Sequence, residues 1–310
     1  MKLFDLHCDT LYRAYTENGH LLHNNFHISF DKADGLAPYI QCMAVWIPDE
    51  YRGKDAERLF DGCVHTMKTQ LADTAIRWCK SKQDIELAVR QNQKAVILTA
   101  ESGAVLNGKL ENIPKLADIG VRMMTLTWNG TNELGDGVGV EENNRGLSEF
   151  GRQCIGEMEK HHIIVDVSHA SEKIFDEVAQ IAQKPFVASH SDAKEICYHR
   201  RNLTDHQFAV IQQKGGIVGM NFCRDFLHKD KTKAKMYDII RHIEHFLSLG
   251  GEKVIAMGGD FDGADIPSDM KGLPSMLELY ELLLRRNYSE QLLEDIFFYN
   301  AYRFFMRCCP

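Results

Sequence analysis

The stretch KLFDLHCDTLYRAY, residues 2–15, decides the fold, because it begins as a short apolar run and then continues without a glycine. The run is typical of a first β-strand, and it ends in a histidine and an aspartate separated by one cysteine. Side chains alternate along a strand, so His7 and Asp9 project to the same side, about 6–7 Å apart along the backbone, whereas Cys8 points away. The pair could hold a metal ion, although a hydrogen-bonded polar couple is the commoner explanation of so short a motif.

Eight short apolar or β-branched runs alternate with segments of helical periodicity along the chain. The helical segments include residues 147–162, 171–183 and 236–251, and several are opened by Ser or Thr and closed by Gly. The alternation is typical of a (β/α)8 barrel of the TIM type, an α/β fold in which helices cover buried parallel strands. We expect its strands at residues 2–7, 39–47, 94–101, 121–128, 162–169, 185–191, 215–222 and 253–263.

An open, doubly wound parallel sheet is the second fold that this alternation allows. A nucleotide-binding sheet of that kind would need a glycine loop after its first strand, and HCDTLYRAY contains no glycine. No linker interrupts the pattern, so we expect one barrel domain over residues 1–310. Residues 49–93 and 273–307 are expected to add helical cover.

The composition indicates a globular protein with a large core. Of the 310 residues, 44% are hydrophobic and 26% charged, and the formal net charge is −8, which disfavours a nucleic-acid-binding surface. No run of about 20 apolar residues predicts a membrane span, and no signal peptide is evident, so we expect no membrane association and a cytoplasmic location. Nine cysteines without a CxxC pair favour reduced, mostly buried thiols.

Polar residues follow the predicted strands at the end where barrel enzymes build their active sites. Histidine and carboxylate are ligands of zinc and similar divalent ions, and several of them at one mouth exceed what isolated core histidines would produce. The pattern therefore predicts a metal site. The candidate residues are His7, Asp9, Glu101, His169, His190, Asp260 and Asp262.

The order of the motifs resembles the membrane dipeptidase (renal dipeptidase-like) family of zinc metallopeptidases. The motifs are DLHCDT (5–10), LTAESG (98–103), TLTWNGTNELGDG (125–137), IVDVSHAS (164–171), VASHSDAKEICYHRRNLTD (187–205) and MGGDFDG (257–263), and the resemblance continues through residues 272–305. It implies a homodimeric hydrolase that cleaves dipeptides with a free C-terminal carboxylate, including those with a D-residue second.

The resemblance also implies a cofactor of two zinc ions. His7 and Asp9 would hold the first ion, His169 and His190 the second, and Glu101 would bridge both. A water or hydroxide would be the second bridging ligand and the nucleophile. A shared carboxylate is physically reasonable, because two nearby dications repel one another.

The resemblance also assigns roles to residues outside the metal-ligand set. Asp260 matches the family's catalytic acid/base, but Asp262 has the same strand parity, so an exchange of roles stays open. Arg201 matches the residue that binds the substrate's terminal carboxylate, for which a planar guanidinium is suited. Trp128 and Asn129 are expected to contact the substrate, and Trp128 stands where animal members have a histidine. Since indole cannot become a cation, stabilisation of the oxyanion at this position is open.

Two further functions remain open at this point. Deaminases and lactonases of related barrels typically carry His-x-His on the first strand and often a modified lysine on the fourth, and this chain has neither. A catalytically inactive relative that binds metal or peptide is the other alternative, and the complete ligand set with Asp260 disfavours it.

Overall fold

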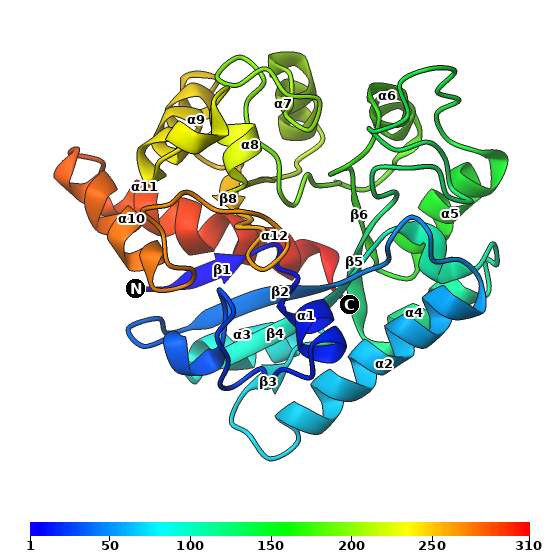
Figure 1. Cartoon of the computed structure of the whole chain (residues 1–310), viewed down its shortest axis with the longest axis horizontal. Coiled ribbons are helices and arrows are strands. Elements are labelled where there is room, and N and C mark those ends of the chain that lie inside the picture. The colour runs from blue at the N-terminus through cyan, green and yellow to red at the C-terminus, as the bar shows by residue number, and fades with distance from the viewer.

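A sheet of short parallel strands forms the centre of the computed structural model, which describes residues 1–310 (Figure 1). The order of hydrogen-bonded strands is β6-β5-β4-β2-β1-β8-β7, and β3 pairs with β4 beside this path. All the pairings are parallel, as the predicted (β/α)8 fold requires. The strands are β1 (Leu3–Asp5), β2 (Tyr39–Trp46), β3 (Arg77–Trp78), β4 (Lys94–Glu101), β5 (Val121–Thr125), β6 (Ile164–Asp166), β7 (Val218–Met220) and β8 (Ile255–Met257).

The predicted strand at residues 185–191 is present only as two isolated bridges, which corrects the sequence-based expectation. Val187 pairs with Asp166 of β6, and Ala188 pairs with Val218 of β7. This segment therefore lies between β6 and β7 and completes the ring of the barrel. It has no continuous ladder, because the Ser189 backbone N–H donates to the Asp166 carboxylate (2.9 Å).

Apolar side chains from every part of the ring fill the inside of the barrel. The C-terminal helix α12 (Asn300–Cys308) adds Phe304 and Phe305 to this interior cluster, and the Phe305 ring lies 4.9 Å from that of Phe4. The base of the barrel is therefore closed by helix α12. The members of the cluster from the strands and the segments beside them are Phe4, Leu6, Ile40, Cys42, Ala95, Ile97, Met123, Ile164, Val187, Ile217 and Ala256.

Helices surround the sheet and bury a second, larger apolar layer against its outer face (Figure 1). Ser148, Ser171 and Thr204 cap their helices by accepting a backbone N–H, as the sequence predicts. None of the helices combines the length and the apolar character needed to cross a bilayer. The remaining helices are α1 (Thr10–Thr16), α2 (Lys54–Leu71), α3 (Lys82–Arg90), α4 (Asn112–Ile119), α5 (Glu149–Lys160), α6 (Glu172–Ile181), α7 (Asp205–Gln213), α8 (Arg224–Leu227), α9 (Met236–Ser248), α10 (Ser275–Arg285) and α11 (Glu290–Glu294), with short turns η1 (Phe30–Lys32), η2 (Gly103–Leu106), η3 (Lys231–Lys233) and η4 (Asp295–Tyr299).

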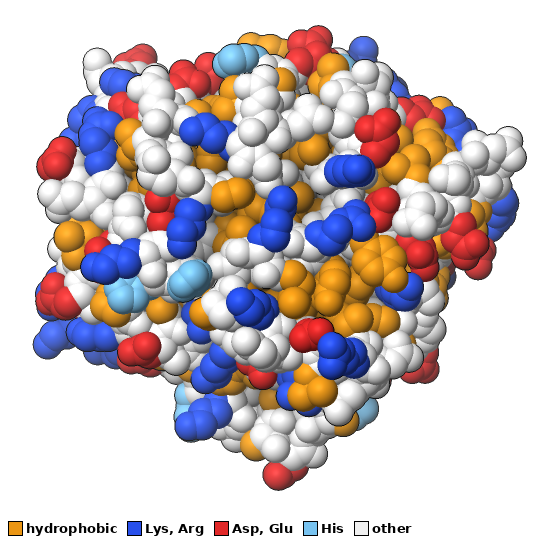
Figure 2. Space-filling view, turned by 180° about the vertical axis from the view of Figure 1, so that it is seen from behind, with side chains coloured by type: hydrophobic (Ala, Val, Ile, Leu, Met, Phe, Trp, Pro, Cys, Tyr) orange, Lys and Arg blue, Asp and Glu red, His pale blue; other side chains and the backbone are white.

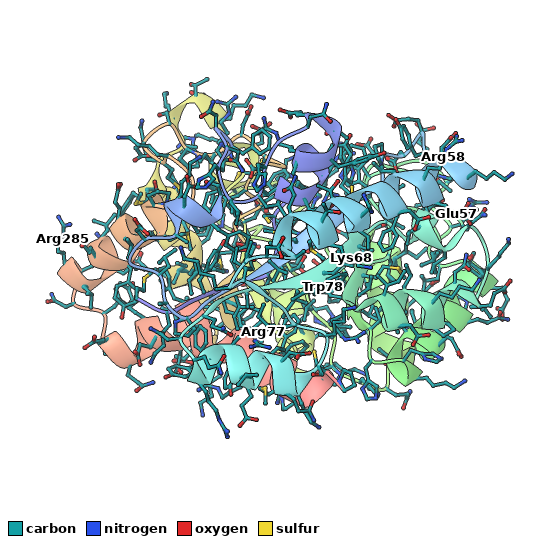
Figure 3. All side chains as sticks on the ribbon, turned by 90° about the horizontal axis from the view of Figure 1, so that it is seen from below. Glu57, Arg58, Lys68, Arg77, Trp78 and Arg285 are labelled. Atoms are coloured by element: carbon teal, nitrogen blue, oxygen red, sulfur yellow. The ribbon has the colours of Figure 1, made fainter.

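The segment 49–93, expected to be helical cover, also contains the short strand β3. Figure 3 shows α2 with Glu57 and Arg58 near its start and Lys68 toward its end, and Arg77 and Trp78 of β3 nearby. On the face opposite to Figure 1, Lys and Arg side chains lie among apolar patches, and acidic side chains are mostly near the outline (Figure 2).

Candidate functional site

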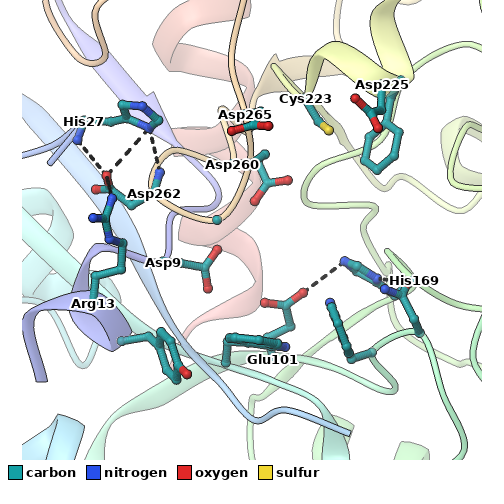
Figure 4. A pocket seen from close by; sticks show the side chains of 17 residues that line it. Asp9, Arg13, His27, Glu101, His169, Cys223, Asp225, Asp260, Asp262 and Asp265 are labelled. Atoms are coloured by element: carbon teal, nitrogen blue, oxygen red, sulfur yellow. Dashed lines mark hydrogen bonds and ion pairs between the residues drawn. The ribbon is translucent and has the colours of Figure 1, made fainter. Parts of the chain in front are cut away.

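A cavity of about 710 Å³ opens where the strands end, and it contains most of the predicted site residues. Figure 4 shows Asp9, Glu101 and Asp260 pointing toward its centre from three sides, with His169 reaching Glu101 from a fourth. The 17 lining residues are Asp9, Tyr12, Arg13, His27, Trp46, Glu101, Trp128, Asn129, His169, Cys223, Asp225, Phe226, Asp260, Asp262, Gly263, Ala264 and Asp265.

The five predicted metal ligands converge around Glu101. Its Oε2 atom lies 3.5 Å from His7 Nε2, and its Oε1 atom lies 3.0 Å from His169 Nε2 and 3.8 Å from His190 Nε2. His7 Nε2 also lies 3.4 Å from Asp9 Oδ2. The five residues that the sequence predicts at the ends of strands therefore lie next to one another in the structure.

Hydrogen bonds at the far side of two imidazoles fix their tautomers. The Asn129 amide oxygen, which can only accept, lies 2.9 Å from His169 Nδ1, so this nitrogen carries the proton. Ser189 Oγ donates to Asp166 (2.5 Å) and therefore accepts from His190 Nδ1 (2.7 Å). Both Nε2 atoms are then acceptors near Glu101 Oε1, at 3.0 and 3.8 Å, an arrangement that a cation bound between them would stabilise.

The cluster fits a metal by its donor set and by its unpartnered atoms. His7 Nε2, Asp9 Oδ1 and His190 Nε2 are buried without any hydrogen-bond partner. Such buried polar atoms are costly unless a ligand satisfies them. Imidazole nitrogen and carboxylate oxygen are the ligands that zinc takes in catalytic sites, so the residues present suit that ion.

The pKa shifts in the cluster come from burial and from the charges that the buried groups place on one another. Burial lowers the pKa of His169 to about 4, with a smaller effect from Arg201, and burial also lowers that of His190. Burial and the charge of Glu101 raise the pKa of Asp9 to about 7. In contrast, the charges of Glu101 and Asp9 outweigh burial and raise the pKa of His7 well above its usual value. The charge of His7 and the contact with His169 likewise outweigh burial and lower the pKa of Glu101. A bound divalent cation would stabilise carboxylates crowded in this way.

Two buried aspartates, which the sequence reasoning missed, hold the segments that carry the ligands. Asp5 accepts from the backbone N–H groups of His7 (3.0 Å) and Gly259 (3.2 Å). Asp166 accepts from the N–H groups of Ser168 (3.0 Å) and Ser189 (2.9 Å). Their signal in the sequence was a charged residue inside an apolar strand, which rarely occurs without a partner.

Asp260 and Asp262 lie in different surroundings, although they are two residues apart. Asp260 Oδ1 faces the metal cluster, 3.8 Å from His7 Nε2. The Asp262 carboxylate accepts from Thr10 Oγ1 (2.5 Å) and from the backbone N–H groups of His27 (2.6 Å) and Ile28 (3.2 Å). In Figure 4 it turns toward Arg13 and His27. The geometry favours Asp260 for chemistry and Asp262 for holding the loop that contains His27.

Arg201 lies close to the cluster but not among the residues that line the cavity. Its side chain is buried, with the residue 6% exposed, and Nη2 donates a long hydrogen bond (3.4 Å) to the His190 carbonyl. Nε has no partner. The guanidinium therefore keeps donors free for another group.

Aromatic rings form one wall of the cavity next to the cluster. The rings of Tyr12 and Trp46 are 4.9 Å apart, those of Trp46 and Trp128 also 4.9 Å, and Trp128 lies 6.2 Å from His169. Trp128 lines the cavity as expected of a substrate contact. Asn129 lines it too, but the side-chain bond that it makes is to His169.

Comparison with known proteins identifies the family. A sequence profile described as membrane dipeptidase (peptidase family M19) matches residues 1–308. An uncharacterized protein of the pqqA 5′ region of Klebsiella pneumoniae is 31% identical over 76% of this chain and 91% of its own length. Dipeptidase 3 of Mus musculus is 26% identical over 88% of this chain, which spans 56% of the mouse protein.

Solved structures agree with this assignment. A metallopeptidase of family M19, dipeptidase AC, superposes with a TM-score of 0.93 at 25% identity, covering 100% of this chain and 99% of its own. A metallopeptidase of Rhodobacter sphaeroides, liganded with a phosphinate mimic of L-Ala-D-Ala, shares the fold with a TM-score of 0.92 at 24% identity, covering 99% of each chain. The chain therefore belongs to the membrane dipeptidase family, peptidase family M19, a family of metal-dependent dipeptidases.

Proposed function

We propose that this protein hydrolyses dipeptides with a free C-terminal carboxylate and that it does so with two zinc ions. The observation that carries the proposal is the buried cluster of three imidazoles and three carboxylates around Glu101, with unpartnered atoms directed inward. The family match favours a dipeptidase over a deaminase or a lactonase.

The chain offers two sets of ligands that share one carboxylate. His7 and Asp9 would hold one ion, and His169 and His190 the other. Glu101 reaches both sets, because its two oxygens face different histidines. When bound, the ions would polarise the scissile carbonyl and make a water molecule acidic enough to attack near neutral pH.

Arg201 supplies recognition of the substrate's terminal carboxylate in this proposal. Its unpartnered Nε and weakly bonded Nη2 leave the guanidinium fork open. A carboxylate accepting from such a fork gains a charge-assisted hydrogen bond worth about 1.5–3 kcal/mol. The site would therefore favour free dipeptides over longer or amidated peptides.

Asp260 supplies proton transfer in this proposal. Its carboxylate lies at the edge of the cavity beside the proposed ligands, where it can accept a proton from the attacking water and return it to the leaving amine. An amide nitrogen leaves poorly unless it is protonated, so one group can serve both halves of the reaction.

We extend the proposal to dipeptides whose second residue is D. The support is the Rhodobacter sphaeroides structure, which binds a mimic of L-Ala-D-Ala on the same fold.

A homodimer is also proposed, and light scattering of the purified protein tests it.

The experiment that tests the proposed function is turnover of a dipeptide library by the chelator-treated and the zinc-reconstituted protein. We expect hydrolysis of L-L and L-D dipeptides only after zinc is restored, with two equivalents bound by elemental analysis. Full activity in a preparation verified as metal-free would overturn the mechanism. Binding of two zinc ions without turnover of any dipeptide would identify an inactive relative.

A further inference from the structure

Asn221 is the residue that directly follows strand β7, and no sequence motif assigned it a role. It is fully buried, and both ends of its side-chain amide are hydrogen-bonded. Nδ2 donates to Asp260 Oδ2 (3.0 Å) and to the His190 carbonyl (3.3 Å). Oδ1 accepts from the backbone N–H of Cys223 (2.6 Å). The side chain thus connects the proposed acid/base with the segment that carries a proposed metal ligand.

The orientation of this amide is determined by its surroundings. The Cys223 N–H can only donate, so the oxygen of Asn221 must face it and the NH₂ group must face Asp260. The backbone N–H of Asn221 donates to the buried carboxylate of Asp192 (3.1 Å), which anchors the residue from a further side. The donor that reaches Asp260 therefore occupies a fixed position.

Asn221 is a hydrogen-bond partner of Asp260, a residue whose backbone has an uncommon conformation. Its φ is +53°, in the left-handed region that non-glycine residues rarely adopt. With Oδ2 held by Asn221, Oδ1 is the oxygen directed at the cluster, 3.8 Å from His7 Nε2. A neutral amide fixes this orientation without introducing a charge that would pair with the carboxylate.

We propose that Asn221 is a positioning residue, which holds one oxygen of Asp260 so that the other is presented to the reacting water and to the leaving amine. The inference rests on the proposed role of Asp260 in proton transfer. It predicts that the contribution of Asn221 to kcat disappears when Asp260 can no longer exchange a proton.

The test measures kcat, KM, zinc content and thermal stability for Asn221→Ser. The serine hydroxyl can still accept from the Cys223 N–H but is too short to reach Asp260. We expect kcat to fall roughly ten- to a hundredfold, the scale of misplacing a reacting group by about 1 Å, with KM and bound zinc nearly unchanged. Asn221→Asp is the isosteric second variant if the serine variant does not fold. It keeps the acceptor and replaces the amide donor by a second carboxyl group beside Asp260, so kcat should fall at least as far.

The matched control is Asn300→Ser in helix α12. Asn300 is also buried and donates to two backbone carbonyls, those of Glu252 and Ile255 (2.8 Å each), but it lies at the base of the barrel. The control variant should lose thermal stability and keep kcat. An equal loss of kcat in both variants would assign Asn221 a structural role.

A double-mutant cycle with Asp260→Asn separates positioning from general damage. If Asn221 acts through Asp260, adding Asn221→Ser to Asp260→Asn should leave kcat unchanged. If the two substitutions lower kcat multiplicatively, or if Asn221→Ser loses zinc, the inference is overturned while the proposed function stays intact. If Asp260→Asn alone keeps full kcat, the proposed role of Asp260 fails, and the inference fails with it.

Discussion

At the scale of single residues, the structure separates side chains that sequence spacing cannot distinguish. Asp260 and Asp262 have the same parity in the sequence, but both lie in a loop at positive φ, +53° and +70°, where strand alternation no longer applies. One carboxylate faces the cluster, and the other binds the loop containing His27. The family resemblance could therefore point to Asp260 as the acid/base in GGDFDG, but the spacing alone could not exclude Asp262.

We predict that Asp260→Asn lowers kcat by roughly a hundred- to ten-thousandfold, the usual contribution of a positioned acid/base. The variant keeps the size of the side chain but cannot accept and return a proton, so KM and zinc content should change little. Asp262→Asn is the matched control and should lower kcat much less, because that carboxylate is occupied by Thr10, His27 and Ile28. A larger loss in the Asp262 variant, with zinc still bound, would exchange the two assignments.

We also predict that a dipeptide amide is cleaved roughly ten- to a hundredfold less efficiently than the free dipeptide, since one charge-assisted contact to Arg201 is lost. The measurement is kcat/KM for the matched acid and amide. In Arg201→Lys, which keeps the charge but lacks the planar fork, the preference for the free acid should shrink. Equal rates on both substrates in the unmodified enzyme would make Arg201 a structural residue.

At the scale of elements, the longest apolar runs were the most predictable. Strands β2 and β4 have eight residues each and occupy nearly the expected positions. Glu101 is the last residue of β4, and His7 and Asp9 follow β1, which pairs with β2. The run 185–191 was harder, because Ser189 binds the Asp166 carboxylate in place of a neighbouring strand. Asn221 was missed although it also follows a strand, because a neutral amide does not indicate metal chemistry by its type.

The C-terminal helix is more than the outer cover that its sequence suggested. Phe305 of α12 packs against Phe4 inside the base of the barrel. We predict that Phe305→Ala costs about 3–5 kcal/mol in the free energy of unfolding, through lost burial and a residual cavity, while kcat of the folded fraction is kept. Denaturant unfolding measures the loss. Arg307→Ala, on the exposed side of the same helix, should change stability by less than about 0.5 kcal/mol.

At the scale of the whole molecule, the proposed metal site would link function to stability. Its ligands come from the ends of β1, β4 and β6 and from residues 185–191, so a bound ion connects distant parts of the ring. Ions that bind only the folded state raise its free energy of unfolding by about 4 kcal/mol at a thousandfold excess over Kd. We predict a clear rise in Tm when zinc is added to the chelated protein. Glu101→Gln should bind zinc more weakly and show a smaller rise. An unchanged Tm in the presence of bound zinc would contradict the coupling.

The aromatic wall allows the intrinsic tryptophan fluorescence of the protein to report on ligand binding in the cavity. The chain has three tryptophans, and two of them, Trp46 and Trp128, line the cavity, whereas Trp78 lies in strand β3. Indole emission depends on nearby charge and water, so binding of an inert dipeptide analogue should shift the intrinsic fluorescence of the protein. Trp78→Phe should retain most of this signal, and Trp128→Phe should lose a large part of it. A titration followed by emission alone would then give the affinity of ligands that are never turned over, without any added label.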